Sequence, residues 1–176
     1  MKVFFDTEFT GLRKDTTLIS IGMITEDGQK FYAELTDYDE SMCDDWVKEN
    51  VLNNLFLHNG TPDDDGTYMI GNKKEVGAEL VKWLDHIPDI MFASDVCHYD
   101  MVLLVDLLTN GGSALDIPPN IPVFCHDINQ DIARNLAITE TSAFEVDREK
   151  LANMDGDKHN ALHDAEVIKK ICEIIC

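Results

Sequence analysis

The chain has 176 residues, of which 44% are hydrophobic and 27% charged, and this composition suits a single globular domain with a sizeable core. Its 14 Lys and Arg against 34 Asp and Glu give a formal net charge of −20, which argues against nonspecific binding to nucleic acid or to an anionic membrane. The acidity permits metal binding, because clustered carboxylates need a cation, and it can equally serve solubility alone.

The N-terminal part of the chain predicts an antiparallel meander of three strands. A short buried strand covers 2–5, a β-branched apolar strand covers 16–25, and an alternating strand covers 29–35 after the turn sequence EDG. Apolar residues at helical spacing then predict a helix over 44–57, in which Trp46 would be a core residue, or a dimer contact if exposed.

The middle of the chain alternates between helical and strand patterns. Residues 59–72 are acidic and rich in turn formers, which predicts a surface loop before an amphipathic helix over 73–87. An apolar strand is predicted over 88–95, a helix over 99–112 and a third strand candidate over 121–127.

The C-terminal part predicts helical pieces and polar loops over 128–158, with the polar stretch NMDGDKHN as a mobile segment. A clear amphipathic helix follows over 161–175. An antiparallel run of strands followed by alternating helices and strands predicts a mixed α/β sheet flanked by helices.

The cysteines and the hydropathy predict a cytoplasmic protein that does not enter a membrane. An odd number of cysteines without a CxxC pair fits a reducing compartment. No signal peptide is apparent, and no run approaches the roughly 18 apolar residues of a membrane span. The cysteines are Cys43, Cys97, Cys125, Cys172 and Cys176.

Two acids follow the first strand directly, in the sequence FFDTEFTGL. Side chains two residues apart on a strand point to the same face, so Asp6 and Glu8 can aim at one point. Two carboxylates that close repel each other unless one is protonated or a cation lies between them, and Mg²⁺ prefers such oxygen ligands. A solvated strand end with two functionless acids would show the same spacing.

Further acids lie at other element boundaries. Asp100 follows an apolar strand in CHYDMVLL, and Asp164 lies in the first turn of the last helix, where its charge suits the helix dipole. His159 precedes Asp164 in HNALHDA. Ends of strands and helices are where α/β sheets place their functional sites.

Together, FFDTEFTGL, CHYDMVLL and HNALHDA resemble the DEDDh branch of the DnaQ-like 3′–5′ exonucleases, and the resemblance spans residues 4–165. FFDTEFTG with TLISIGMI and WVKENVL looks most similar to the mycobacterial-type 3′–5′ exoribonuclease branch. The resemblance implies a ribonuclease H-like fold over 1–176 as one exonuclease domain. It also implies hydrolysis of terminal phosphodiester bonds of single-stranded RNA or DNA, with RNA preferred.

The resemblance assigns roles to individual residues. Asp6, Glu8, Asp100 and Asp164 would hold two divalent ions, Mg²⁺ or Mn²⁺, and His159 would be the general base. The 3′ nucleotide would bind at residues that follow the first acid, namely Thr7, Phe9, Thr10 and Leu12. The family resemblance also makes a homodimer plausible.

One departure from the family concerns the middle motif. The sequence FASDVCHYD stands where the family has His-Asn before the middle motif, so Asp95 is a possible extra acid. Fewer matching residues therefore support the assignment of Asp100 than that of Asp6 or Asp164.

Three alternatives stay open at the level of sequence. The pairs His126-Asp127 and His163-Asp164 spell the motif of HD-type phosphohydrolases, although that class is all-helical and a strand-rich N-terminus counts against it. The absence of a basic tract leaves room for a small-nucleotide phosphohydrolase. A non-catalytic interaction module on a nuclease fold is the third, and the complete set of four acids and one His counts against it.

Overall fold

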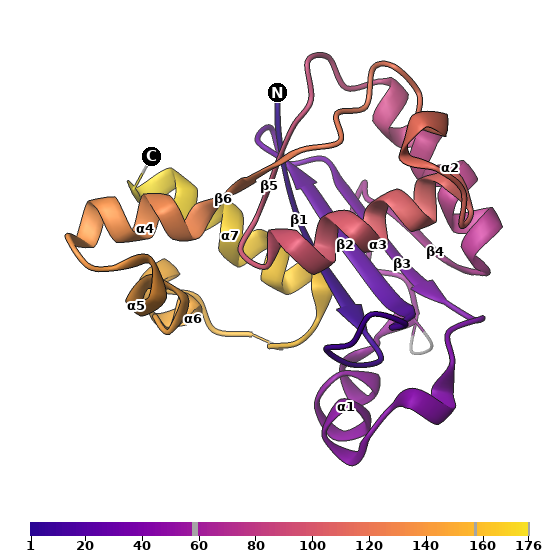
Figure 1. Cartoon of the computed structure of the whole chain (residues 1–176), viewed down its shortest axis with the longest axis horizontal. Helices are drawn as coiled ribbons and strands as arrows, with labels where there is room; N and C mark the ends of the chain where they lie inside the picture. Colours follow the sequence, from indigo (N-terminus) through magenta and orange to yellow (C-terminus); the bar gives the residue numbers. More distant parts are fainter. Residues whose placement is uncertain (58–59, 157, 176) are drawn as a thin grey trace.

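A six-stranded mixed sheet organises the structure, a computed structural model that describes residues 1–57, 60–156 and 158–175 (Figure 1). The spatial order of the strands is β4-β3-β2-β1-β5-β6. Adjacent strands among β1, β2 and β3 are antiparallel, which confirms the predicted meander, and β4, β5 and β6 join in parallel. The bounds are β1 Lys2–Phe9, β2 Leu18–Thr25, β3 Lys30–Leu35, β4 Thr67–Gly71, β5 Met91–Ser94 and β6 Cys125–Asp127.

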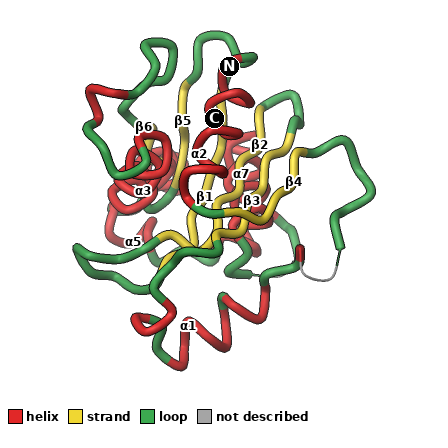
Figure 2. Tube along the Cα trace, turned by 90° about the vertical axis from the view of Figure 1, so that its right-hand side faces the viewer, coloured by secondary structure: helices red, strands yellow, loops and turns green. Residues whose placement is uncertain are grey.

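Helices cover both faces of the sheet, with α2 and α3 on one face and α7 on the other (Figures 1 and 2). None of the helices in the described part of the chain is long and apolar enough to cross a bilayer. The bounds are α1 Asp45–Asn50, α2 Lys73–Asp85, α3 Cys97–Thr109, α4 Ile128–Leu136, α5 Glu140–Phe144, α6 Arg148–Ala152 and α7 Ala161–Ile175.

β1 takes part in the cores on both sides of the sheet. Because successive side chains of a strand point to opposite faces, Val3 and Phe5 enter the core beneath α2 and α3, whereas Phe4 enters the core beneath α7. All three side chains are buried. β1 also continues to Phe9, beyond the predicted end at residue 5, so Asp6 and Glu8 lie within a strand that is anchored on both faces.

α7 approaches the sheet closely at a single glycine. A Cβ atom at Gly22 of β2 would lie 2.3 Å from the backbone of Ala161 and Leu162. Only glycine therefore lets the first turn of α7 lie directly on β2, one strand from Asp6, which pairs with Gly22. This contact places the N-terminus of α7 beside the acids of β1.

Three further predicted elements differ from the structure. Within the predicted loop 59–72, residues 67–71 form β4; residue 59 lies outside the described residues, as does residue 157 of the predicted mobile segment. The predicted helix 44–57 ends at Asn50 and continues as a 3₁₀ turn. The strand predicted over 121–127 is reduced to three residues.

Candidate active site

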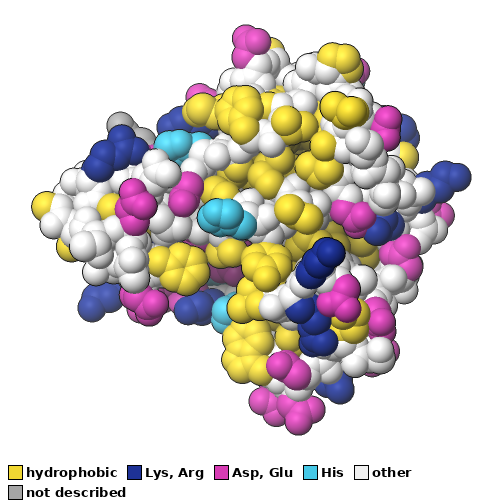
Figure 3. Space-filling view, viewed as in Figure 1, with side chains coloured by type: hydrophobic (Ala, Val, Ile, Leu, Met, Phe, Trp, Pro, Cys, Tyr) yellow, Lys and Arg dark blue, Asp and Glu magenta, His cyan; other side chains and the backbone are white. Residues whose placement is uncertain are grey.

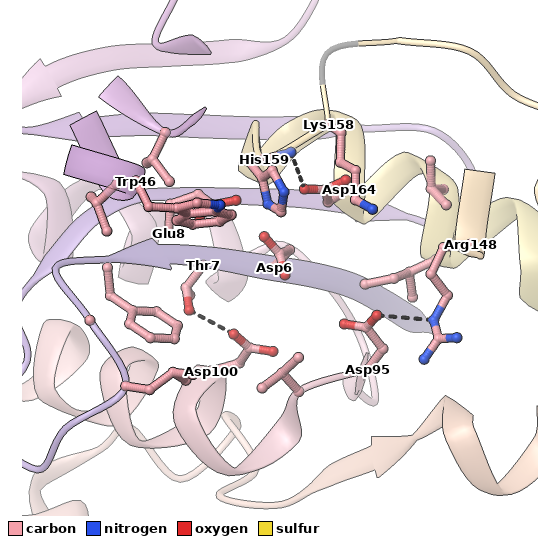
Figure 4. Close-up of a pocket in the computed structure, with 18 of the residues that line it drawn as sticks. Asp6, Thr7, Glu8, Trp46, Asp95, Asp100, Arg148, Lys158, His159 and Asp164 are labelled. Carbon is pink, nitrogen blue, oxygen red and sulfur yellow. Dashed lines mark hydrogen bonds and ion pairs between the residues drawn. The ribbon is translucent and has the colours of Figure 1, made fainter. Parts of the chain in front are cut away.

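The acids of β1 lie at an edge of the sheet where the carboxyl ends of several strands meet. β1, β5 and β6 run parallel, so residues that follow them lie side by side. Asp6 and Glu8 lie in the C-terminal half of β1, and Asp95 directly follows β5. Asp6 is only 8% exposed. Figure 4 shows Asp6 between Asp164 on one side of β1 and Asp100 and Asp95 on the other.

Asp100 is held in the first turn of α3 by two hydroxyl groups. Thr7 Oγ1 donates to Asp100 Oδ1 at 2.6 Å, and Ser94 Oγ donates to Asp100 Oδ2. Thr7 points to this face because it alternates with Asp6 and Glu8 along β1. Asp100 itself is fully buried, and its place at the helix N-terminus favours its charge.

The entry of α7 positions Asp164 and His159 together. Asn160 caps the helix, because its Oδ1 accepts the backbone N–H groups of Leu162 at 3.1 Å and His163 at 3.2 Å. Asp164 Oδ2 accepts the backbone N–H of His159 at 3.0 Å. His159 adopts a left-handed conformation with φ of 65°, which turns the chain sharply before the cap.

These residues line a cavity of about 550 Å³, a volume in the range of small-ligand sites. Its rim carries large exposed apolar side chains, among them Leu12, which is 76% exposed, and Phe144, which is 56% exposed. Figure 3 shows that hydrophobic side chains occupy much of the middle of this face, with charged side chains of both signs around and beside them. The cavity thus combines an acidic floor with an apolar rim.

Trp46 lines this cavity, and the prediction that it belongs to the core is wrong. Its ring is 52% exposed and meets the His159 ring edge-to-face, with centroids 4.9 Å apart and an interplanar angle of 75°. The buried positions of α1 and its end are taken by Val47 and Val51, which pack with Ile19 and Cys43, and Trp46 lies one residue outside this pattern. Trp83, in contrast, packs against Phe31 and the core.

The four predicted substrate contacts do not all reach the cavity in the same way. Phe9 and Leu12 line the cavity, and Phe9 also stacks on Tyr99 at 5.2 Å. Thr7 reaches the cavity but is engaged with Asp100. Thr10 lies outside the cavity lining, is 1% exposed and accepts the backbone N–H of Thr17 at 3.0 Å, so it shapes the turn after β1.

Burial and mutual repulsion raise the pKa values of the site carboxyls. Burial is the first cause for each of them. The pKa of Glu8 rises to about 8, with Asp164 as its strongest neighbouring charge, and the pKa values of Asp100 and Asp164 rise to about 7. The pKa of Asp6 rises well above its ordinary value. The four carboxyls cannot all be ionised near neutrality unless a cation joins them.

The donor atoms suit divalent cations. Glu8, His159 and Asp164 each offer one ligand atom within 4.8 Å of the others, and Asp6, Asp95 and Asp100 form a second such set. Carboxylate oxygens dominate both sets, and oxygen ligands are those that Mg²⁺ and Mn²⁺ prefer. The residues therefore fit a site for divalent metal.

Comparisons with known proteins agree with this geometry. Residues 1–176 match the family described as the 3′–5′ exoribonuclease Rv2179c-like domain. The 3′–5′ exoribonuclease Rv2179c of Mycobacterium tuberculosis strain H37Rv is 30% identical over 132 residues, which are 74% of this chain and 73% of that protein. The chain belongs to the Rv2179c-like family. It is therefore a 3′–5′ exoribonuclease, a hydrolase of phosphodiester bonds.

Solved structures confirm the fold. The nuclease domain of 3′hExo, a DEDDh family member solved with rAMP, superposes with a TM-score of 0.65 at 12% identity and covers 97% of this chain and 88% of its own. A 3′-exonuclease solved in recognition of a histone mRNA stem-loop gives the same TM-score at 13% identity, and this chain spans 61% of it. The predicted ribonuclease H-like fold is thus confirmed, as is the predicted similarity to a DEDDh exonuclease at the level of structure.

The two His-Asp pairs do not form an HD-type centre. The His163 ring points away from the acids toward Glu149, with Nε2 3.3 Å from Oε1, and His126 contacts Asp131. The six-stranded sheet of this family also differs from the all-helical architecture of HD proteins. His98 is exposed, and the hydroxyl partners of Asp100 are Thr7 and Ser94. Homodimer formation stays a prediction.

In the absence of divalent ions, we expect the thermal midpoint of the Rv2179c-like domain to fall as the pH rises from about 5 to about 8. Glu8, Asp100 and Asp164 bind protons more tightly in the folded state, so the stability that protonation gives is present at low pH. It is lost as the pH passes through folded pKa values of about 8, 7 and 7. His159, whose pKa is lowered chiefly by burial, acts in the opposite direction but is a single group.

Calorimetry in EDTA should show a fall of about 5 °C or more across this range. Mn²⁺ added at the upper pH should restore the midpoint, because the cation replaces the protons. The double variant Asp6→Asn/Glu8→Gln should have a flatter pH profile than the parent chain. An equal slope in both proteins would contradict this account of the pH dependence.

Proposed function

We propose that this exoribonuclease removes nucleotides from the 3′ end of single-stranded RNA with two divalent ions, Mg²⁺ or Mn²⁺, held by Asp6, Glu8, Asp100 and Asp164. The observation that carries the proposal is the meeting of these four carboxylates with His159 at the floor of an apolar-rimmed cavity. When bound, two such ions stabilise the attacking and leaving oxygens of an in-line displacement.

His159 has the properties of a general base. Burial, followed by the charge of Lys158, lowers the pKa of its imidazole, so the ring is neutral near pH 7 and can accept a proton from water. The backbone bond from His159 to Asp164 and the edge-to-face contact with Trp46 hold the ring beside the acids. The nearness of its ring to Glu8 and Asp164 supports the role of His159 as the base that takes the proton of the attacking water.

The apolar rim suits the terminal nucleotide. Leu12, Trp46 and Phe144 line the cavity with exposed apolar side chains. The two aromatic rings can stack on any base without reading its sequence, and Leu12 adds an apolar contact. The 3′hExo domain was solved with rAMP, a single nucleotide, and the cavity of about 550 Å³ has room for a ligand of that class. Phe9, at the end of β1, also lines the cavity and adds to its apolar surface.

The charge distribution supports a short footprint. Lys158 and Arg148 are the basic side chains that line the cavity within the described residues. The proposal is therefore contact with a few terminal nucleotides, with the ions supplying most of the positive charge. Single-stranded DNA is a second polymer that the same contacts would accept, and a small-nucleotide phosphohydrolase is the competing activity on this fold.

A time course on end-labelled oligonucleotides tests the proposed substrate. With Mg²⁺, single-stranded RNA labelled at the 3′ end should release its label as a mononucleotide in the first turnover, whereas RNA labelled at the 5′ end should give a ladder that shortens one nucleotide at a time. DNA of the same sequence should react more slowly, and EDTA should abolish both reactions. Cleavage of free dinucleotides with no attack on longer RNA would favour the small-nucleotide alternative.

Isosteric variants test the assigned roles. Asp6→Asn, Glu8→Gln and Asp164→Asn should each lower kcat on RNA about 10²–10³-fold or more, because each removes charge that holds the ions. His159→Ala should lower kcat about 10²–10⁴-fold and leave Mn²⁺ affinity, measured by calorimetry, close to that of the parent. Full activity in any acid variant would refute the mechanism, and a collapse of Mn²⁺ affinity in His159→Ala would make His159 a ligand instead.

Trp46 should contribute to substrate binding through its exposed ring. We expect Trp46→Ala to raise KM for a short RNA about tenfold, within the range measured for loss of one base–aromatic stack. Trp46→Phe retains a stacking face and should recover most of the loss. Trp83→Phe, on α2 in the core, changes a tryptophan outside the cavity and should leave KM as it is. An unchanged KM in Trp46→Ala would show that the ring does not touch substrate.

A further inference from the structure

Asp95 belongs to the same group of carboxylates as the four acids already assigned. It lines the cavity, and oxygen atoms of Asp6, Asp95 and Asp100 lie within 4.8 Å of one another. Its place directly after β5 follows from the parallel pairing of β5 with β1. The two sets of candidate ligands therefore hold five carboxylates, one more than the four that the DEDDh pattern names.

Asp100 has less freedom than Asp95 to reach a cation. It is fully buried, and each of its carboxylate oxygens already accepts a hydroxyl proton, from Thr7 and from Ser94. Asp100 thereby joins Thr7, the neighbour of Asp6 on β1, to Ser94, the neighbour of Asp95 on β5. Hydrogen bonds of this kind hold the residues around a metal site in place.

Asp95 is oriented for direct contact. Arg148 Nε donates to only one of its oxygens, Oδ2, at 3.2 Å, and the side chain retains 18% exposure. Figure 4 shows the other oxygen pointing away from Arg148, on the side of Asp100. Asp95 thus has an oxygen without a bond to Arg148, and its donor atom lies within 4.8 Å of that of Asp6, the acid with which it would share a cation.

Arg148 is held too firmly to move toward substrate. Its Nη1 donates to the carbonyl oxygens of Ala143 and Val146, both at 2.8 Å, and its Nη2 donates to Asn129 Oδ1. Asn129 Nδ2 in turn donates to the backbone carbonyl of Asp95 at 2.6 Å. The guanidinium and the amide together fix both the side chain and the backbone of Asp95.

We propose that Asp95 and Asp6 are direct ligands of the second divalent ion, with Asp100 holding their chain neighbours Ser94 and Thr7 in place and Arg148 acting as the positioning residue for Asp95. The inference rests on the proposed two-ion function and changes which middle acid touches metal. The charges agree, because two divalent ions and one guanidinium balance five carboxylates.

Calorimetric titration with Mn²⁺, which needs no substrate, tests the proposal on the full chain. The parent should bind two ions. Asp95→Asn should lower the affinity for the second ion about 100-fold or more and leave the affinity for the first within about threefold of the parent. Asp100→Asn should lower the affinity for the second ion only about tenfold, as expected of a supporting group.

Asp127→Asn is the matched control. Asp127 pairs with Ser94 on the neighbouring strand and caps α4, and asparagine preserves such a cap. It removes the same charge nearby, so both ions should bind within about threefold of the parent.

Two ions bound with parental affinity by Asp95→Asn would overturn the proposal. A second variant guards against misfolding: Asp95→Cys should gain tight Cd²⁺ binding with a thiolate–metal absorption band, whereas Asp127→Cys should not, because soft ions prefer thiolate. Absence of that band in a folded Asp95→Cys protein would also overturn it.

A structural role for Asp95 is distinguished by Arg148→Gln, which breaks the ion pair and retains the carboxylate. If the ion pair served folding alone, Arg148→Gln and Asp95→Asn would lower the affinity for the second ion equally, and the proposal would fail. If Asp95 is a ligand, Arg148→Gln should bind the second ion more tightly than Asp95→Asn does. A parent chain that bound no Mn²⁺ and cleaved no RNA would refute the proposed function itself, whereas an active two-ion parent with a normal Asp95→Asn variant would refute only this inference.

Discussion

The parallel pairing of β1 with β5 is the constraint on which the site depends. Three residue pairs, Lys2 with Met91, Val3 with Phe92 and Phe4 with Ala93, align the two strands so that their carboxyl ends meet. Asp6 and Asp95 come together because of this register, although they lie far apart in the sequence. A parallel pair cannot be closed by a hairpin, so the chain between the strands supplies α1, β4 and α2 before β5 enters the sheet.

The same pairing concentrates unfavourable charge. Carboxylates buried within a few ångströms of one another repel, and this repulsion is what raises their pKa values in addition to burial. The sheet withstands the repulsion because β1 is packed on both faces, by Val3 and Phe5 on one side and Phe4 on the other. A strand anchored in this way keeps its acids at constant separation whether or not a cation is present, which is the preorganisation that metal catalysis requires.

The sequence predicted the parts of the site that depend on local geometry. The two-residue spacing of Asp6 and Glu8 on a strand and the place of Asp164 in a first helical turn follow from strand and helix periodicity alone. β4 was missed because it is a short edge strand after an acidic turn, where the loop pattern dominates. The contact of Trp46 with His159 and that of Arg148 with Asp95 join distant segments, and no local pattern announces them.

The net charge of −20 affects how a nucleic-acid substrate approaches the site. A polyanionic substrate must approach an acidic protein, and the cavity offers it only Arg148 and Lys158 among its described lining residues. Arg148 is already paired with Asp95, so that Lys158 is the basic side chain that can face a phosphate among the described lining residues. Under the proposed function, apolar stacking and the ions would supply the affinity at the terminal nucleotide. The negative charge of the chain would then repel the remainder of a long RNA and favour release after a few nucleotides over tracking along a polymer.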